Sequence, residues 1–358
     1  GGFTGKAGVL EKFENLGDTA TDKKFDGSTS YINQVLENSS NYVRVKSAAS
    51  FAGTSAVEEF TTGADGSSET AIGAGPVGLG WDKFKAAENI DVSLLLTGHP
   101  DLVVQNYVID NIAETRKDCM AFITPDVPNT ASAQDIVTAV STLSSSSYAV
   151  VDSGHKYQYD KYNDVYRWIP LNGDVAGLCA RTDDARDPWF SPAGYSRGGI
   201  KNVVKLALNP TKTDRDLLYK NGINPVITQA GQGTLLFGDK TYLNQPSAFD
   251  RINVRRLFIV LEKAISTASK STLFEFNDEF TRAQFRNLVE PFLRDVQGRR
   301  GIYDFRVVCD ETNNTSQVID SNQFVGDIYI KPARAINFIQ LNFVAVRTGV
   351  EFSEIVGQ

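Results

Sequence analysis

In the middle of the chain, short apolar runs and amphipathic stretches follow one another in turn. The runs at 91–98, 119–125 and 147–154 predict buried strands, and the stretches at 100–118 and 132–143 repeat apolar residues with a helical period. Strands and helices that alternate at this spacing indicate a mainly parallel sheet with crossover helices. We therefore expect an α/β domain in this part of the chain.

The first of these helices is expected to begin at Pro100, a residue that favours the first helical turn. Its predicted buried face consists of Leu102, Val103, Ile109, Ile112 and Ala113. After the third strand, alternating aromatic and polar residues at 156–168 predict a hairpin, 173–187 predicts a helix, and 188–199 predicts an ordered loop held by aromatic residues.

The last third begins a new pattern. Residues 213–222 predict a short helix, and 225–243 predict a hairpin around Gly231 and Gly233. A long amphipathic helix is expected over 251–270, with an apolar stripe formed by Val254, Leu257, Phe258, Leu261 and Ile265.

A second long helix is predicted around an apolar stripe formed by Phe285, Leu288, Val289, Phe292, Leu293 and Val296. Thr281 and Gln284 have the spacing of a capping box at its start. Pro291 predicts a kink or a division of the helix. Three strands are expected to follow, at 303–310, 324–332 and 336–346.

These elements divide the chain into four parts. Residues 1–60 are polar, and their pattern supports no confident fold. The fold class expected for the rest is α/β, or α+β overall, with a mixed-sheet α/β middle domain over 61–195 and an α+β C-terminal domain over 196–345. Residues 346–358 form an extended C-terminal arm.

The arm has the pattern of a strand without a partner. Val350, Phe352 and Val356 recur at even positions, and nothing after them closes a hairpin. A free strand at a terminus either frays or adds to an exposed sheet edge on another molecule, and the sequence leaves both outcomes open.

Charge narrows the range of partners. With 36 Lys and Arg against 43 Asp and Glu the net charge is -7, so we expect no nucleic acid partner. Residues 251–310 reverse this balance, with eleven basic against eight acidic residues. The basic residues include Arg251, Arg255 and Arg256 at one helix start and Arg282 and Arg286 on the next helix. Two interpretations are open: solvated helix faces, or electrostatic docking onto an acidic protein surface.

The cysteines and the apolar runs exclude further classes. Cys119, Cys179 and Cys309 are far apart, which favours small core residues in a reducing compartment over a disulfide framework. No apolar run approaches the roughly 20 residues of a membrane span, so no membrane insertion is expected. The Gly-Gly start suggests a fragment.

A glycine pattern raises the alternative of a nucleotide-binding α/β enzyme. Gly73, Gly75 and Gly78 have the spacing of a dinucleotide-binding loop. The preceding segment is rich in Gly, Ser and acidic residues rather than apolar, and the next predicted strand ends in Thr97-Gly98-His99 without a carboxylate for the ribose. A flexible glycine loop is therefore the favoured interpretation.

A second short motif suggests a serine nucleophile but lacks its partners. Gly194-x-Ser196-x-Gly198 matches the nucleophile elbow of α/β-hydrolases. Both histidines, His99 and His155, precede Ser196, whereas the hydrolase order places the histidine after it. We expect no catalytic residue, no cofactor and no metal site, and hence no enzyme.

Four segments together carry a family resemblance. They are "VAGLCARTDDARDPWFSPAG", "RINVRRLFIVLEKAI", "FLRDVQGRRGIYDFRVVCDETNN" and "GDIYIKPARAINFIQLNFVAV". In this order they resemble the sheath protein of contractile phage tails, particularly of T-even-like myophages, over roughly residues 61–358. The resemblance also implies more polypeptide before this chain, including an N-terminal arm.

The resemblance implies a mechanical protein of the virion, assembled in the host cytoplasm. Sheath subunits stack as hexameric rings around a tail tube, and contraction drives the tube through the host envelope. The implied partners are further copies of the chain, the tail tube protein, and baseplate and tail terminator proteins. No P-loop is present, which agrees with a spring rather than an ATP-driven motor.

Site residues follow from the resemblance by position. The family's C-terminal domain lies innermost, so the candidate tube-facing residues are Arg251, Arg255, Arg256, Arg282 and Arg286. Terminal arms lend strands to neighbouring subunits, so the candidate inter-subunit strand contains Val346, Gly349, Val350, Phe352 and Val356. A nucleotide-binding enzyme and a monomeric adhesion or scaffold module remain as alternatives.

Overall fold

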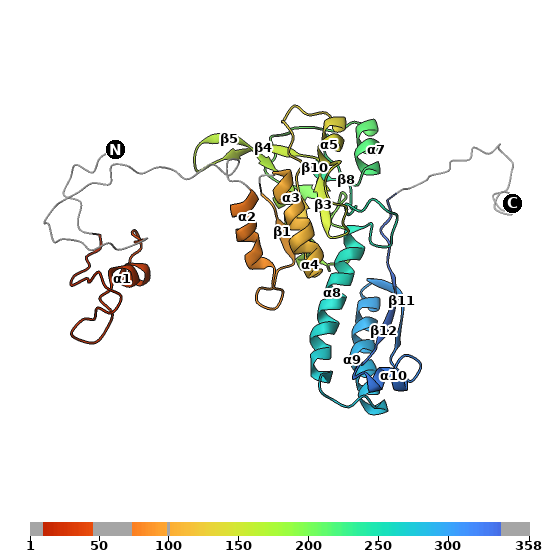
Figure 1. Ribbon diagram of the computed structural model, residues 1–358. Coiled ribbons are helices and arrows are strands. Elements are labelled where there is room, and N and C mark those ends of the chain that lie inside the picture. The colour runs from red at the N-terminus through yellow and green to blue at the C-terminus, as the bar shows by residue number, and fades with distance from the viewer. Residues whose placement is uncertain (1–9, 46–73, 99–100, 338–358) are drawn as a thin grey trace. The chain divides into compact units, whose positions relative to one another are not determined.

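Figure 1 shows a computed structural model of the chain, which describes residues 10–45, 74–98 and 101–337. The chain divides into two compact units, Gly1–Gly66 and Ser67–Gln358. We describe each unit by itself.

The first unit contains one helix, α1 (Ile32–Ser39), within its described part. Two isolated bridges, Gly17 with Tyr31 and Lys23 with Thr29, close the chain on itself before this helix. Leu36 is the buried residue of α1, so this unit has a small apolar interior.

A parallel sheet of four strands forms the centre of the second unit. Its order is β1 (Leu94–Leu96), β2 (Met120–Ile123), β3 (Ala149–Asp152) and β8 (Ile223–Asn224). Every neighbouring pair runs parallel, which confirms the predicted parallel sheet and the positions of its first three strands. The fourth strand, β8, was not predicted.

Helices cover the sheet and bury its side chains in two cores. The helices are α2 (Ala74–Trp81), α3 (Leu102–Val108), η3 (Ile109–Ala113), α4 (Glu114–Arg116), α5 (Ala133–Val140), α6 (Asn172–Ala185) and α7 (Lys212–Lys220), with a short 3-10 turn η2 (Asp82–Phe84). Val150 packs in the core with α3 and α6, whereas Val151 packs in the core with α5 and α7. Because consecutive strand residues point to opposite faces, the two cores lie on the two sides of the sheet.

The helix after β1 differs in detail from its prediction. Asp101, not Pro100, caps α3, since its side chain accepts a hydrogen bond from the backbone N–H of Val103. Val103 is exposed rather than buried, and Val104 and Val108 take the buried positions. The helix continues through the π-turn η3, which alters the phase of its apolar face before Ile112 and Ala113.

Two small antiparallel sheets extend the second unit. β4 (His155–Asp160) pairs with β5 (Val165–Pro170) and β7 (Lys205–Leu206), which confirms the predicted hairpin. β10 (Gly233–Leu236) pairs with β9 (Val226–Gln229) and β6 (Gly199–Ile200), which confirms the second hairpin. Gly231 and Gly233 have φ values of 77° and 79°, a conformation that glycine adopts without strain.

Strand pairing bears on the domain boundary expected at residues 195 and 196. Val151 of β3 pairs with Ile223 of β8, so residues beyond 196 complete the central sheet. Asn224 also bonds to the carbonyl of Lys240. We therefore propose that the central domain extends to about the start of α8 (Ile252–Ser269).

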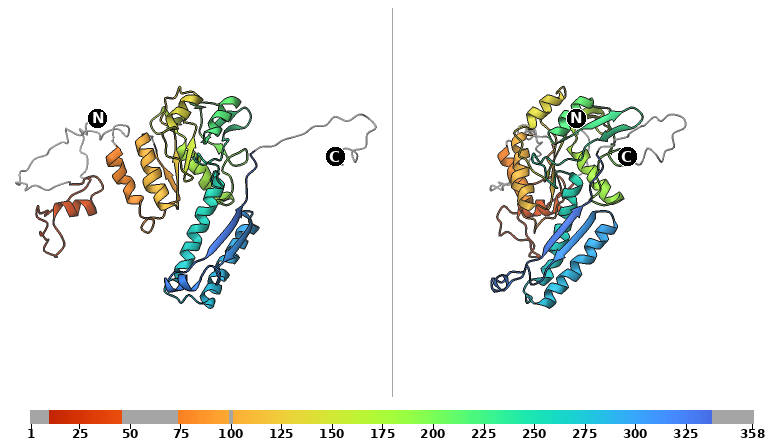
Figure 2. Two further views of the ribbon diagram at one scale, coloured as in Figure 1. Left: turned by 45° about the vertical axis from the view of Figure 1, so that its right-hand side comes forward. Right: turned by 90° about the vertical axis from the view of Figure 1, so that its right-hand side faces the viewer.

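A helical hairpin and a two-stranded sheet form the C-terminal module. It contains α8, a 3-10 turn η4 (Lys270–Thr272), α9 (Glu279–Gly298), β11 (Ile302–Val308), α10 (Ser316–Asp320) and β12 (Asp327–Pro332). In Figures 1 and 2, α8 and α9 lie side by side and the β11–β12 pair lies against them. Most of the third predicted strand, 336–346, lies outside the described residues; 336 and 337 are not in a strand.

Two predictions about α9 need correction. Asp278 caps the helix by accepting from the N–H of Thr281, so Thr281 lies inside the helix and does not begin a capping box. Pro291 does not divide α9, which is one helix of 20 residues. Val289 and Leu293, on either side of the proline, are both buried, and this packing holds the two halves together.

The predicted apolar stripes are otherwise confirmed, and α8 contributes to two cores. Ile252 and Ile259 pack in the core of the central sheet, whereas Leu257 and Leu261 pack against α9. In α9, Phe285 is buried but Leu288 is exposed. Helix α8 therefore joins the C-terminal module to the central domain by burial on both of its sides.

At the carboxyl end of β3, Asp152 is fully enclosed. One carboxyl oxygen accepts from the Thr124 hydroxyl at 2.6 Å, and the other accepts from the N–H of Gly154 at 2.8 Å. Burial raises the pKa of Asp152 to about 8. The native carboxyl therefore holds a proton that the unfolded chain has already released at neutral pH.

We expect Asp152 to make stability fall with rising pH. Between the unfolded pKa near 3.8 and the folded pKa of about 8, the native state binds more protons, so the free energy of unfolding decreases across this window. Asp152→Asn keeps the shape without the charge. In urea denaturation, the free energy of unfolding of the variant should rise relative to that of the wild type between pH 4 and pH 8.5. A difference in free energy that stays constant with pH would contradict the prediction.

Candidate functional site

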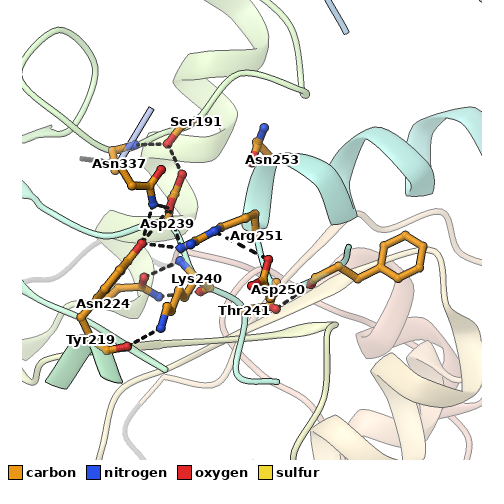
Figure 3. A network of polar contacts seen from close by, with 12 residues as sticks. Ser191, Tyr219, Asn224, Asp239, Lys240, Thr241, Asp250, Arg251, Asn253 and Asn337 are labelled. Atoms are coloured by element: carbon orange, nitrogen blue, oxygen red, sulfur yellow. Dashed lines mark hydrogen bonds and ion pairs between the residues drawn. The ribbon is translucent and has the colours of Figure 1, made fainter. Parts of the chain in front are cut away.

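A polar network joins the central domain, the start of α8 and the segment that follows β12 (Figure 3). Its centre is Asp239, which lies 3.5 Å from the Arg251 guanidinium and accepts hydrogen bonds from the hydroxyls of Ser191 and Tyr219. Arg251 also donates to the Tyr219 hydroxyl at 2.5 Å. The Asp239 carboxylate thus contacts side chains from three separate segments of the chain, those of Ser191, Tyr219 and Arg251.

The segment after β12 is held by the same network. The Asn337 amide donates to the Tyr219 hydroxyl at 2.7 Å and to Asp239 at 3.0 Å. Asn253, near the start of α8, donates to the carbonyls of Trp189 and Ala333. These contacts hold the chain at Asn337, the last residue that the structure describes.

Enclosure changes the acidity of the network's titratable groups. Burial, together with the neighbouring Asp239 carboxylate, raises the pKa of Tyr219 to about 12. Burial lowers the pKa of Lys240, whose ammonium lies over the Tyr219 ring at 4.4 Å and donates to the Tyr219 carbonyl. Tyr219 therefore stays protonated and can donate to Asp239 at physiological pH.

Arg251, one of the predicted tube-facing residues, belongs to this network. Arg255 is also internal: its guanidinium lies between the rings of Phe249, at 3.8 Å, and Tyr148, at 4.2 Å. It donates to the hydroxyls of Ser147 and Tyr148 at 2.7 Å and 3.2 Å. Burial lowers the pKa of Arg255. Its charge is used inside the fold.

The other predicted arginines make internal contacts as well. Arg256 is buried and pairs with Asp183 at 2.5 Å, and Arg282 is buried and donates to Asn277. Arg286 is partly exposed and donates to the carbonyl of Cys309. Arg255, Arg256 and Arg282 are enclosed by their own chain and present little surface to a partner. The arginine docking face stays a prediction, with Arg251 and Arg286 as its more exposed members.

The candidate inter-subunit strand, containing Val346, Gly349, Val350, Phe352 and Val356, lies outside the described residues. What the sequence reasoning missed is the polar network that holds Asn337, the last described residue. Tyr219, Asp239 and Asn337 are far apart in the chain and belong to no motif, so no local signal identifies them.

The first of the two short motifs takes a different structure from the one expected, and the second lacks the geometry of its suggested function. Gly75 and Gly78 lie within helix α2 rather than in a flexible loop, and Gly78 packs next to the Tyr107 ring. Gly73 lies outside the described residues. Ser196 lies in turns that lead into β6, not between a strand and a helix, so the geometry of a nucleophile elbow does not form.

The three cysteines are buried and free, as predicted for core residues. Burial raises the pKa of Cys119 to about 12 and that of Cys179 to about 11. Within the described ranges no group of His, Cys, Asp and Glu has the arrangement of a metal site. None of the helices described there is long and apolar enough to cross a membrane.

We expect Arg255→Ala to destabilise the chain by about 3 kcal/mol, because it removes the stacking on two rings and leaves two buried hydroxyls without their donor. Chemical denaturation measures this loss. Arg294→Ala, an exposed arginine on α9, is the matched control and should cost at most about 0.5 kcal/mol. Equal stability of the two variants would restore a surface role for Arg255.

Two family models match adjacent parts of the chain. The phage tail sheath protein central domain matches residues 102–242, and the phage tail sheath C-terminal domain matches residues 244–345. The two matches meet close to the start of α8, where the central sheet ends and the C-terminal module begins.

Among curated proteins, the chain is similar to two tail sheath proteins. The tail sheath protein of Vibrio phage KVP40 is 43% identical, and the match covers 98% of this chain and 56% of the relative. The tail sheath protein of Enterobacteria phage T4 is 46% identical, and the match covers 81% of this chain and 47% of the relative. The chain therefore spans about half the length of these relatives.

Solved structures share the fold. The helical sheath of the anti-feeding prophage in its contracted state superimposes with a TM-score of 0.62 at 19% identity, over 77% of this chain and 76% of that one. A chain of the six-fold symmetrised baseplate of the same particle gives 0.63 at 19% identity, over 76% and 73%. With the family models and the two curated relatives, these likenesses show that the chain belongs to the family of phage tail sheath proteins.

Proposed function

We propose that this protein is a structural subunit of a contractile phage tail sheath, which polymerises around a tail tube and drives the tube through the host envelope by contraction. The observation that carries this proposal is the match to tail sheath proteins across both the central domain and the C-terminal module. The fold supports it with two features suited to assembly: an open sheet edge, and the polar network that holds Asn337 ahead of the arm.

The open edge belongs to the β11–β12 pair. In the described part of the chain this sheet has two strands, so each strand has one edge without a strand partner. Unpaired main-chain groups along such an edge favour the addition of a further strand. We propose that the arm, residues 346–358, adds to this edge on a neighbouring subunit.

Asn337, nine positions before the arm, is bonded to Tyr219 and Asp239 on the central domain. We propose that this contact gives the exchange a direction. A strand donated from a defined point can reach one neighbour in one register, which favours a regular lattice over disordered aggregation.

We further propose hexameric rings, with the tail tube, the baseplate and the tail terminator as partners in the virion and assembly in the host cytoplasm. The similarity to a chain of a six-fold symmetrised baseplate supports the ring number and the baseplate contact. The internal contacts of Arg255, Arg256 and Arg282 mean that docking onto the tube must use other residues. The work of contraction is stored in differential contacts between two lattices.

The arm can be tested by removing its ability to form a ladder. Val350→Pro with Phe352→Pro should abolish regular tubes in negative-stain electron microscopy, because proline donates no main-chain hydrogen bond. Val350→Thr is the matched control, since threonine keeps both the shape and the N–H. Tubes from the proline variant would contradict strand donation, and regular tubes from the wild-type chain would support the sheath function.

A further inference from the structure

Four arginines line one cavity at the junction of the central domain and the C-terminal module. The cavity has a volume of about 360 Å³ and lies between the loop after α6 and the end of α9. Its charged lining residues are Arg186, Arg197, Arg299, Arg300 and a single carboxylate, Asp187. None of these arginines was singled out by the sequence motifs.

The cavity lacks counter-charge. Asp187 pairs with Arg299, Asp295 lies 3.6 Å from the same guanidinium, and the carboxyl ends of α6 and α9 add about half a negative elementary charge each. Together these supply about three negative charges against four guanidinium groups. Burial and the charge of Arg186 lower the pKa of Arg197. An anion in the cavity would relieve this imbalance.

One of the arginines that line the cavity, Arg300, has a left-handed backbone conformation. Arg300 follows the end of α9 with a φ of 66°, at the position that glycine usually occupies. The N–H of Arg300 bonds to the Gln297 carbonyl and that of Gly301 to the Val296 carbonyl, which completes the usual helix-ending motif. A residue with a side chain costs free energy in this conformation, which makes Arg300 a candidate for a role of its side chain.

The opposite end of α9 carries a complementary surface. The connection from η4 into α9 exposes three phenylalanines, Phe274, Phe276 and Phe280, by 105%, 83% and 76%. Glu275 and Glu279 lie between them and are also exposed. We call these five residues the acidic–aromatic tip.

One residue of the tip has the same left-handed backbone conformation as Arg300 in the cavity. Phe274 has a φ of 69°, which is rare for a bulky residue, and this conformation holds its ring in solvent. Aromatic side chains exposed together mark an interaction site, and carboxylates among them suit a cationic partner.

The two surfaces cannot meet within one chain. They lie at opposite ends of α9, whose 20 residues span about 30 Å, and Figure 1 shows the α8–α9 connection at the end of the module away from the central sheet. We propose that the acidic–aromatic tip of one subunit docks into the arginine cavity of a second copy. This inference rests on the proposed function, since it assigns one contact of the self-assembly.

The predicted contact is head to tail. Two different surfaces are used, so each copy keeps one free surface and the chain of contacts continues as a ring or a helix. Guanidinium groups bind carboxylates with two parallel hydrogen bonds and also stack on aromatic rings. Phe190 already lies under Arg197 at 5.5 Å in the cavity, which illustrates the second mode.

The test uses substitutions that relieve strain. Arg300→Gly and Phe274→Gly each put glycine at a left-handed position, so the melting temperature of the monomer should stay the same or rise. We expect each to weaken self-association of the full chain at least tenfold in sedimentation velocity at low salt. Arg294→Ala on the exposed face of α9 is the control for charge loss and should associate as the wild type does.

A mixing experiment identifies the partner. Arg300→Gly retains an intact tip and Phe274→Gly an intact cavity, so an equimolar mixture should form dimers that neither variant forms alone. Within one chain, Arg300→Glu combined with Glu275→Arg should recover association that each single change loses.

Three outcomes would overturn the inference. One is a wild-type chain that associates while both glycine variants associate equally well; the sheath function would then stand without this contact. Another is a melting temperature that inorganic phosphate raises in the wild type but not in Arg300→Gly, with association unaffected, which would identify a small-anion site. A wild-type chain that never associates would overturn the inference, whereas the proposed function would stand, because it rests on the sequence matches across both domains.

Discussion

Burial of helix α8 on two sides is the constraint on which the rest of the second unit depends. Ile252 and Ile259 belong to the core of the central sheet, and Leu257 and Leu261 belong to the core formed with α9. Because one rigid helix is part of both cores, the C-terminal module cannot turn on the central domain without opening apolar surface to water. Helix α8 therefore connects the two cores of the unit.

The same constraint decides the role of the arginines at the start of α8. A helix buried on two sides has little surface in contact with solvent. The charged side chains of Arg255 and Arg256, which an amphipathic helix would place in water, are therefore buried. The structure compensates with aromatic rings and hydroxyls around Arg255 and with Asp183 next to Arg256. Charge that the sequence suggests for a partner is used to join the two domains.

Sequence periodicity predicted most of the fold because its signals are local. The parallel strands at 94–96, 120–123 and 149–152 and the apolar stripes of α8 and α9 all follow from the spacing of apolar residues. Strand β8 has two residues, too few for any period, and α2 is rich in glycine, which favours a loop. Tertiary packing decided both of these elements.

The polar network could not be predicted from the sequence, because its members come from separate segments of the chain. The network of Tyr219, Asp239 and Asn337 joins residues separated by about a hundred positions, and each is an ordinary polar residue in its own segment. The cavity arginines likewise come from two segments, the loop after α6 and the end of α9. No local motif encodes such a meeting, since the fold alone brings the segments together.

The distribution of polar groups explains how such a chain suits assembly. Inside the fold, Asp152, Asp239 and Arg255 bond to neighbouring side chains and keep the body rigid. At the margins of the described part lie groups that a partner could bind: two strand edges, a cationic cavity and an acidic–aromatic tip. A lattice that rearranges while its subunits stay intact requires this division, because contacts between copies must change at a lower cost in free energy than contacts within a copy. A body held by shared cores, with paired groups inside and complementary groups outside, meets that requirement.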